Sequence, residues 1–137
     1  MRAEAVIYAL LGASSGLSAL IGTRLYPNKL PQNTAMPAVA YRAISGIELT
    51  PIDAQAGYQV VRTRVQITAM AKNYAEVKAI LEQVRLACLY RSGSISTAVG
   101  TVRVLSVARD SVGADMRDDD LALYLQSMDL LVTHYET

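Results

Sequence analysis

The sequence holds 137 residues, a length typical of one domain, with 13 Lys and Arg against 12 Asp and Glu and a formal net charge of +1. So even a balance gives no electrostatic reason to expect nucleic acid or an anionic membrane as the main partner. An apolar share of 52% against 18% charged residues favours a chain that buries part of its surface by association, with an Ala-rich monomer as the alternative.

Cysteine content and hydropathy bear on the compartment. Cys88 is the only cysteine, so no internal disulfide can form, which favours a reducing compartment or indifference to redox state. The apolar stretch from Ala5 to Ala13 has the length of a signal-peptide core, but Glu4 precedes it, and we interpret it as an amphipathic helix. No uninterrupted apolar run approaches the ~20 residues of a membrane span, and we expect no membrane partner.

The N-terminal region predicts two short helices. Apolar residues recur at helical spacing in residues 3–12, and Gly12 ends this helix. A second helix begins at the Ser14–Gly16 run, and Gly22 ends it because glycine tolerates the left-handed cap conformation.

The segment Thr23–Pro37 is predicted to run extended over the surface. Its three prolines are Pro27, Pro31 and Pro37. They bias the preceding residues away from helix, remove backbone donors and lower the entropy lost when the segment is ordered.

Two strands with alternating faces follow. Val39, Tyr41 and Ala43 share one face of a strand expected from Ala38 to Glu48. In "YQVVRTRVQITAM" (58–70), apolar and polar residues alternate, which is typical of a half-buried strand with one solvated or interface face. The stretch 48–57 is too long for a tight turn and is predicted to project as a loop.

The stretch Asn73–Arg91 predicts the longest helix. Asn73 can cap its N-terminus, with Glu76 in the capping-box position. Its apolar stripe comprises Val77, Ile80, Leu81, Val84 and Cys88. Residues 92–100 are predicted as a turn or a short extended piece.

The C-terminal third predicts two strands around a polar loop. Thr101–Ala108 has apolar residues on both faces, and Leu121–Tyr135 is a long strand whose imperfect alternation indicates partly covered faces or a bulge. Residues 109–120, "RDSVGADMRDDD", are expected to form a second projecting loop. The element order predicts an α+β fold, one domain over residues 1–137, with a single mostly antiparallel sheet of about four strands packed against the long helix and short N-terminal helices.

No residue set predicts catalysis, a metal or a cofactor. His134 is the only histidine, and Asp129, five positions away on a strand, faces the opposite side, so no hydrolytic triad forms. We expect an ordinary surface or interface histidine. Cys88 lies on the apolar stripe, and we expect a buried, unreactive thiol. Gly12, Gly16 and Gly22 match neither phosphate-binding motif.

Two charged clusters have competing interpretations. The aspartates at 110, 115 and 118–120 could bind a hard cation, but their spacing matches no calcium loop, and we interpret them as a solvated loop tip. Arg62, Arg64, Arg103 and Arg109 could gather on one sheet face and bind phosphate, or pair with carboxylates of a neighbouring subunit, which the near-neutral charge favours.

An ordered set of segments resembles one known family. The segments are "IYALLGASSGLSALIG", "RLYPNKLPQ", "PAVAYRAISG", "RVQITAMAKNYAEVKAI" and "SMDLLV". Over about residues 5–135 the chain resembles the tail-completion family of long-tailed phages, prophages and gene transfer agents, whose members are similar to the lambda tail terminator. Ala69–Met70–Ala71, where bulkier residues are expected, and the lack of tryptophan depart from the family pattern.

The resemblance implies a structural, non-enzymatic virion protein without a cofactor. Family members form a ring, commonly a hexamer, on the last ring of the tail tube, stop tube polymerisation and present a surface for head–tail joining. The implied partners are the tail tube protein and a head-completion or neck protein, with DNA passing through the lumen unbound. The implied location is the head-proximal end of the tail, after synthesis in the host cytoplasm. Two alternatives stay open: a neck or head–tail adaptor protein, and a small α+β enzyme or ligand-binding domain.

The ring implied by the resemblance supplies candidate site residues. Contacts with tail or neck are expected from the two loops, at Glu48, Asp53, Gln55, Asp115, Arg117, Asp118, Asp119 and Asp120. Subunit contacts are expected at Tyr26, Arg42, Arg62, Arg64 and Tyr124. The segment Thr23–Pro37 either lies on a neighbouring subunit or spans the gap between helix and sheet. Negative charge at 118–120 is expected to keep passing DNA from sticking.

Overall fold

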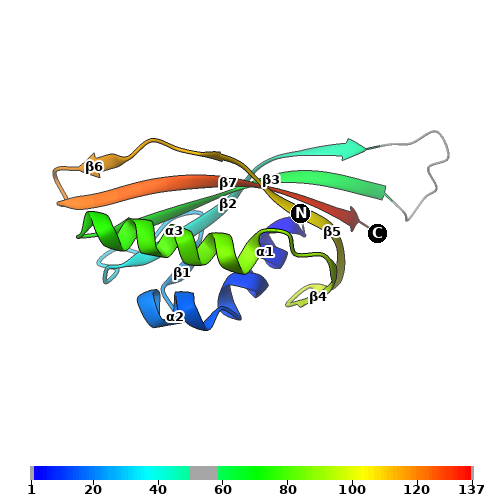
Figure 1. Cartoon of the computed structure of the whole chain (residues 1–137), viewed down its shortest axis with the longest axis horizontal. Helices are drawn as coiled ribbons and strands as arrows, with labels where there is room; N and C mark the ends of the chain where they lie inside the picture. Colours follow the sequence, from blue (N-terminus) through cyan, green and yellow to red (C-terminus); the bar gives the residue numbers. More distant parts are fainter. Residues whose placement is uncertain (1, 50–58, 137) are drawn as a thin grey trace.

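A computed structural model describes residues 2–49 and 59–136, which form three helices and a curled sheet of seven strands (Figure 1). The helices are α1 (Ala3–Gly12), α2 (Ser15–Ile21) and α3 (Tyr74–Cys88). The strands are β1 (Leu25–Pro27), β2 (Ala38–Leu49), β3 (Gln59–Ala71), β4 (Gly93–Thr97), β5 (Gly100–Val112), β6 (Met116–Asp118) and β7 (Leu123–Glu136).

The sheet is built around its longest strands. Its order is β1-β2-β3-β7-β5-β4, and every pairing is antiparallel except that of β1 with β2. β3 pairs along the full length of β7 on one side. On the other side of β7, β6 pairs with Leu123–Leu125 and β5 pairs with Met128–His134. β6 and β5 therefore lie one after the other along the same side of β7.

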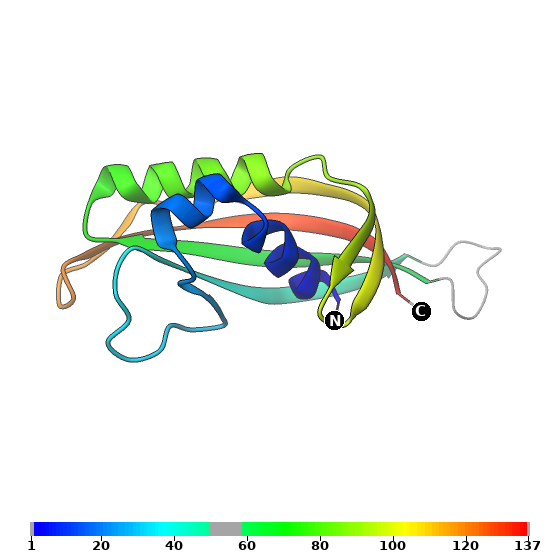
Figure 2. The same cartoon turned by 90° about the horizontal axis from the view of Figure 1, so that it is seen from below.

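All three helices lie on one face of the sheet (Figures 1 and 2). Every second residue is buried from Thr63 to Ala71 on β3 and from Gln126 to His134 on β7, and these residues face the helices. Ile7 of α1 and Ile80 of α3 are fully buried in the same core. The predicted alternation of β3 is therefore confirmed.

Local signals place the helix ends where the sequence predicts them. Asn73 Oδ1 accepts a hydrogen bond from the Ala75 backbone N–H at 2.8 Å, and Ser14 Oγ accepts one from Leu17 N–H at 3.2 Å. Gly22 ends α2 with φ of 61°, a conformation that glycine adopts without strain. Within the described ranges no single helix is long and apolar enough to cross a membrane, although α1 and α2, bent by 82°, reach that length and composition together.

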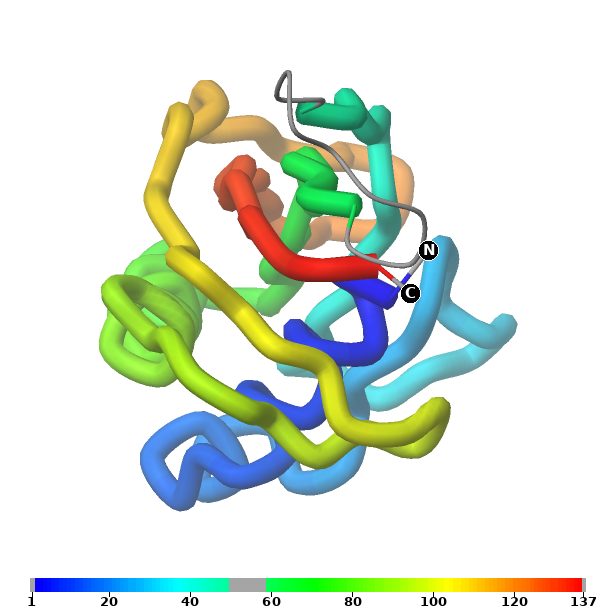
Figure 3. The backbone as a smooth tube through the Cα atoms, turned by 90° about the vertical axis from the view of Figure 1, so that its right-hand side faces the viewer, coloured from blue at the N-terminus to red at the C-terminus, as the bar shows by residue number. Residues whose placement is uncertain are grey.

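The two ends of the sheet carry different features. The two chain ends lie near one another (Figures 1 and 3), and Glu136 pairs in register with Gln59 where β3 begins. The β6–β7 turn and the junction between β3 and α3 lie at the opposite end.

The α+β class is confirmed, but a sheet of about four strands backed by one long helix is wrong, since seven strands pair and three helices cover them. A loop over residues 109–120 is also wrong, because β5 continues to Val112 and β6 pairs with β7. These residues lie at the sheet edge, where exposed polar side chains are tolerated and a strand has the composition of a loop.

The expected surface or interface position of His134 is wrong. Its side chain is fully buried on the helix-covered face, in register with Val61 and Val104. Its Nδ1 lies 3.1 Å from the Tyr135 carbonyl oxygen, whereas Nε2 has no hydrogen-bond partner among the described residues.

Candidate functional site

The sheet face opposite the helices, which we call the open face, is not covered by any of the three described helices (Figure 1). It presents the even-numbered residues 60–70 of β3 and the odd-numbered residues 123–135 of β7, because their neighbours in sequence point into the core. Most of these side chains are half-buried, which is typical of a sheet face with no second layer over it.

Polar contacts cross the middle of the open face. Arg64 Nη1 donates to Asp129 Oδ2 at 3.1 Å and forms an ion pair with Asp110. The hydrogen bonds to Asp110 and Asp129 raise the pKa of the Arg64 guanidinium. Because β3, β5 and β7 each supply one member, the cluster links three adjacent strands and leaves Arg64 paired within its own chain.

Further hydrogen bonds continue this polar line toward the β6–β7 end of the sheet. Arg42 Nε donates to Gln66 Oε1 at 3.0 Å, and the hydroxyls of Thr68 and Ser127 are 2.8 Å apart. Apolar groups flank the line, and Ile47 of β2 is 62% exposed. The open face therefore combines fixed polar pairs with apolar area that the single chain does not bury.

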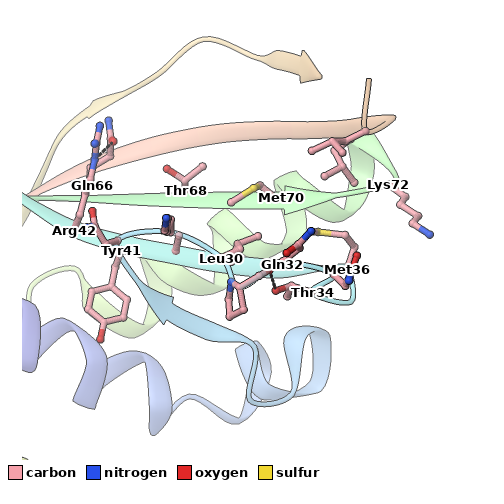
Figure 4. Close-up of a pocket in the computed structure, with 17 residues that line it drawn as sticks. Leu30, Gln32, Thr34, Met36, Tyr41, Arg42, Gln66, Thr68, Met70 and Lys72 are labelled. Carbon is pink, nitrogen blue, oxygen red and sulfur yellow. Dashed lines mark hydrogen bonds between the residues drawn. The ribbon is translucent and has the colours of Figure 1, made fainter. Parts of the chain in front are cut away.

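A groove of about 700 Å³ opens at one end of this face (Figure 4). One wall is the segment 28–36, which follows β1 and returns to β2. The floor is formed by β2 and β3, and Leu121 and Leu123 close the far side. We call this hollow the 28–36 groove.

The 28–36 groove has an apolar interior and a cationic rim. Its apolar side chains are Leu30, Pro31, Met36, Ala40, Met70, Leu121 and Leu123. Its cations are Lys29, Arg42 and Lys72, and no Asp or Glu lines it. Figure 4 shows Leu30, Met36 and Met70 around the hollow, Lys72 reaching outward, and the Tyr41 ring pointing away.

A second polar cluster ties the start of α3 to the sheet beside the β6–β7 end. Lys78 Nζ donates to Gln126 Oε1 at 2.6 Å and pairs with Asp115, which also accepts from Tyr74 OH at 3.1 Å. Gln126 Nε2 in turn donates to the Gly113 carbonyl at 2.8 Å. Hydrogen bonds from Lys78 and then Tyr74 lower the pKa of Asp115. Asp115 is thus held in place rather than projecting on a free loop.

The acidic turn after β6 is exposed but internally ordered. Asp118 Oδ1 accepts from the backbone N–H groups of Asp120 and Leu121 at 3.1 and 3.2 Å. Arg117 Nε donates to Asp119 at 2.8 Å, and its guanidinium carbon lies 4.8 Å from the centre of the Tyr124 ring. Asp118 therefore shapes the turn, and Asp119 and Asp120 remain accessible to solvent.

The structure brings some predicted subunit-contact residues together and separates others. Arg42, Arg62 and Arg64 share the open face, and Tyr26 pairs in register with Ala40 at the 28–36 groove. Tyr124 lies on the helix-covered side, with its ring edge-on to Tyr74 at 6.0 Å. The four arginines proposed to share a face do not all do so.

Arg109 is the exception among those arginines. It pairs in register with buried Leu130, so it lies on the helix-covered side, and its charge helps to lower the pKa of Glu82 on α3 after the hydrogen bond from Arg85. Arg103, the fourth arginine of the predicted set, has its guanidinium carbon 5.7 Å from the centre of the Tyr135 ring. A common phosphate site for the four is therefore wrong, because a strand places successive residues on opposite faces.

The predicted tail- or neck-contact residues fall at opposite ends of the sheet. Glu48 is exposed near the end of β2, in register with Val61 at the end of the sheet that holds Glu136. Asp53 and Gln55 lie outside the described residues. The other residues of this set are at the β6–β7 end: Asp115, Arg117, Asp118, Asp119 and Asp120.

Sequence reasoning did not find the 28–36 groove. The signal was present, since Leu30 and Met36 stand among polar residues. The prediction that this segment runs extended is wrong beyond β1, because the chain bends and turns there, with Asn28 and Asn33 at positive φ. What the sequence could not give was the return of this segment beside β2 and β3, which depends on long-range pairing.

No arrangement for catalysis or metal binding appears in the part of the chain that the structure describes. Burial raises the pKa of the Cys88 thiol to about 12, so the residue is a neutral core thiol near neutral pH. No group of three or more His, Cys, Asp or Glu residues in the described ranges could hold a metal ion. The open face and its groove are exposed surfaces that combine apolar and polar side chains.

Comparisons with known proteins identify a family and a similar fold. A family model described as Tail completion protein gp17 matches residues 5–127. The fold is similar to a chain in the virion of a native gene transfer agent particle, with a TM-score of 0.69, 14% sequence identity, and coverage of 95% of this chain and 92% of that one. No curated protein sequence matches.

Proposed function

The chain belongs to the family of tail completion protein gp17, structural components of the bacteriophage tail, and from this membership we propose that it is a tail terminator. In this role, copies of the chain close into a ring on the last ring of the tail tube. The ring, which we propose to be a hexamer, stops tube polymerisation and offers a surface for head–tail joining. DNA passes through its lumen without specific binding.

The open face is the observation that carries the proposal. A sheet with helices on one side only leaves apolar area, including Ile47, that a second copy can bury around a closed axis. Tyr26, Arg42 and Arg62 are proposed subunit contacts on this face, and Tyr124 at the β6–β7 end. Arg62 forms no ion pair with any described residue, so its charge is available to a neighbour.

Charged residues lie at both ends of the sheet, and this arrangement supports a protein that connects two different neighbours in the particle. We propose that the end carrying Glu48 meets one neighbour in the particle, and Asp53 and Gln55, which lie outside the described residues, remain contacts predicted from the sequence. The other end, carrying Asp115, Arg117 and the acidic turn 118–120, meets the opposite neighbour. The tail tube protein and a head-completion protein are these two neighbours.

Deletion of the gene tests this role directly. Electron microscopy of particles from the deletion strain is expected to show overlong tails or tails not joined to heads, restored by the wild-type gene in trans. Tails of normal length with heads that leak DNA would instead identify a neck or head–tail adaptor protein. Normal, infectious particles would contradict both roles.

A further inference from the structure

We propose that the 28–36 groove binds an extended, acidic segment of another protein of the particle, one apolar side chain of which enters the hollow. This inference rests on the proposed function, because it names a partner at the head–tail junction. The groove opens on the same sheet face as the proposed contacts between identical subunits and shares Arg42 with them, but its proposed occupant is a different protein.

The shape of the groove suits a polypeptide segment. The hollow of about 700 Å³ is open to solvent, and its interior presents Leu30, Met36, Met70 and Leu123. Leu121, at the far wall, is 65% exposed in the isolated chain. Methionine side chains are unbranched and adapt to an inserted group, so the floor can accept an aliphatic or aromatic side chain.

The charge around the groove favours an acidic occupant. Lys29, Arg42 and Lys72 are all exposed, and no carboxylate lines the hollow. Lys29 and Lys72 form no ion pair with a described residue. In a chain whose net charge is only +1, this local excess of cations is selective for negative groups.

The polar lining favours a peptide over nucleic acid or lipid. Four amide side chains border the hollow: Asn28, Gln32, Asn33 and Gln66. Amide groups donate to and accept from a peptide backbone, whereas single-stranded nucleic acid binds on stacking aromatic rings. Tyr41 is the aromatic residue of the lining, and its ring points away from the hollow.

A second copy of the chain is a poorer occupant than a different protein. The exposed acidic turn at 118–120 is the obvious acidic element of the chain, but it adjoins the groove that it would have to fill. Two copies could exchange such turns only about a two-fold axis. That symmetry gives a closed pair and not the head-to-tail contacts of a ring.

Site-specific crosslinking in assembled particles tests the proposal. A photo-crosslinking amino acid is placed at Gln32 on one wall and, separately, at Leu121 on the other, and crosslinked peptides are sequenced by mass spectrometry. The same amino acid at Leu86, exposed on α3, is the positional control. Both groove positions are expected to capture one segment of a different particle protein, containing Asp or Glu beside an apolar residue.

Binding of the captured segment, made as a synthetic peptide, measures the role of the cations. The double variant Lys29→Gln/Lys72→Gln is expected to weaken binding to the full-length chain about tenfold at low salt, as the loss of two exposed charge contacts predicts. The double variant Arg85→Gln/Arg109→Gln removes the same charge from the helix-covered side and is expected to leave binding unchanged. Circular dichroism and thermal melts confirm that both variants fold.

The outcomes separate this inference from the terminator role. Crosslinks to other copies of the chain only, to DNA, or to no partner in joined particles would overturn the groove proposal. Equal binding by both double variants would also overturn it. Overlong tails in the deletion strain would still identify a terminator in each of these cases.

Discussion

At the scale of single residues, the side chains most able to carry chemistry are core residues. Cys88 lies on the buried stripe of α3, as its spacing predicts, and burial raises the pKa of its thiol to about 12. His134 is also fully buried, against the sequence-based prediction, because the alternation of β7 places it with Leu130 and Val132 on the helix-covered face. Its position near the end of the chain gave no sign of this burial.

The buried thiol gives the protein a specific response to alkaline pH. In the unfolded chain the thiol loses its proton above about pH 8.5, but in the folded chain it stays protonated up to about pH 12. Its contribution to stability is therefore complete below the unfolded pKa and falls by about 1.4 kcal/mol per pH unit above it. Urea unfolding of the wild type is expected to show a steeper loss between these pH values than Cys88→Ala.

Thiol labelling checks the same residue independently. A water-soluble disulfide reagent is expected to leave Cys88 unmodified in the native protein and to react fully once urea unfolds it. Rapid labelling of the native protein would contradict the buried position.

At the scale of elements, sequence patterns identified the strands and helices that face the core. β3 and α3 have one clear period each. β3 was predicted within one residue at each end, and the start of α3 was predicted correctly, but α3 ends at Cys88 and not at Arg91. β5 was cut short in the prediction because its register shifts between Val104 and Ser106, and again between Arg109 and Ser111, interrupt the alternation. β6 has three mostly exposed residues and no pattern to detect.

The cluster of Lys78, Asp115 and Gln126 shows how such a pattern-free segment is held. It joins α3 and β7 to the link between β5 and β6, so the edge of the sheet is fixed by side chains from two other elements. Because the pKa of Asp115 is lowered, its contribution to stability is present above its ordinary pKa and is lost as the pH falls through the lowered value.

Carboxyl titration by NMR tests this cluster. The Asp115 carboxyl is expected to titrate below the usual value of about 3.9, and Lys78→Met is expected to move it back toward that value. Arg85→Met is the matched control on the same helix, since it breaks the pair with Glu82 and leaves Asp115 alone. An unchanged Asp115 titration in Lys78→Met would show that the contact is absent in solution.

At the scale of the whole molecule, one sheet face is covered by helices and the other by none. The predicted arginines Arg42, Arg62 and Arg64 share the open face, as strand alternation allowed, but Arg64 is already paired with Asp110 and Asp129. The 28–36 groove could not be predicted, since its walls come from segments some 90 residues apart and their meeting depends on sheet pairing. The alternation of residues within one strand predicts which side chains share a face, but it does not predict which strands lie beside it in the sheet.

The open face leads to an expectation about assembly. Light scattering at high concentration with tail tube protein present is expected to give a ring mass of about six copies. Ile47→Glu is expected to lower that mass. Full burial of one isoleucine side chain contributes roughly 1.5–3 kcal/mol, whereas burial of a carboxylate is unfavourable. Leu86→Glu on α3 is the matched control. Isolated subunits of the wild type under these conditions would exclude ring formation.

The two chain ends lie near one another at one end of the sheet, with the 28–36 groove at the other. A fluorescent reporter or affinity tag fused to either terminus therefore leaves the molecule from the same place. Such fusions will obstruct whatever docks at that end while sparing the groove, so paired N- and C-terminal fusions cannot serve as controls for one another. An internal label in the β4–β5 turn, at Ala98 or Val99, provides an attachment point that does not depend on the chain ends.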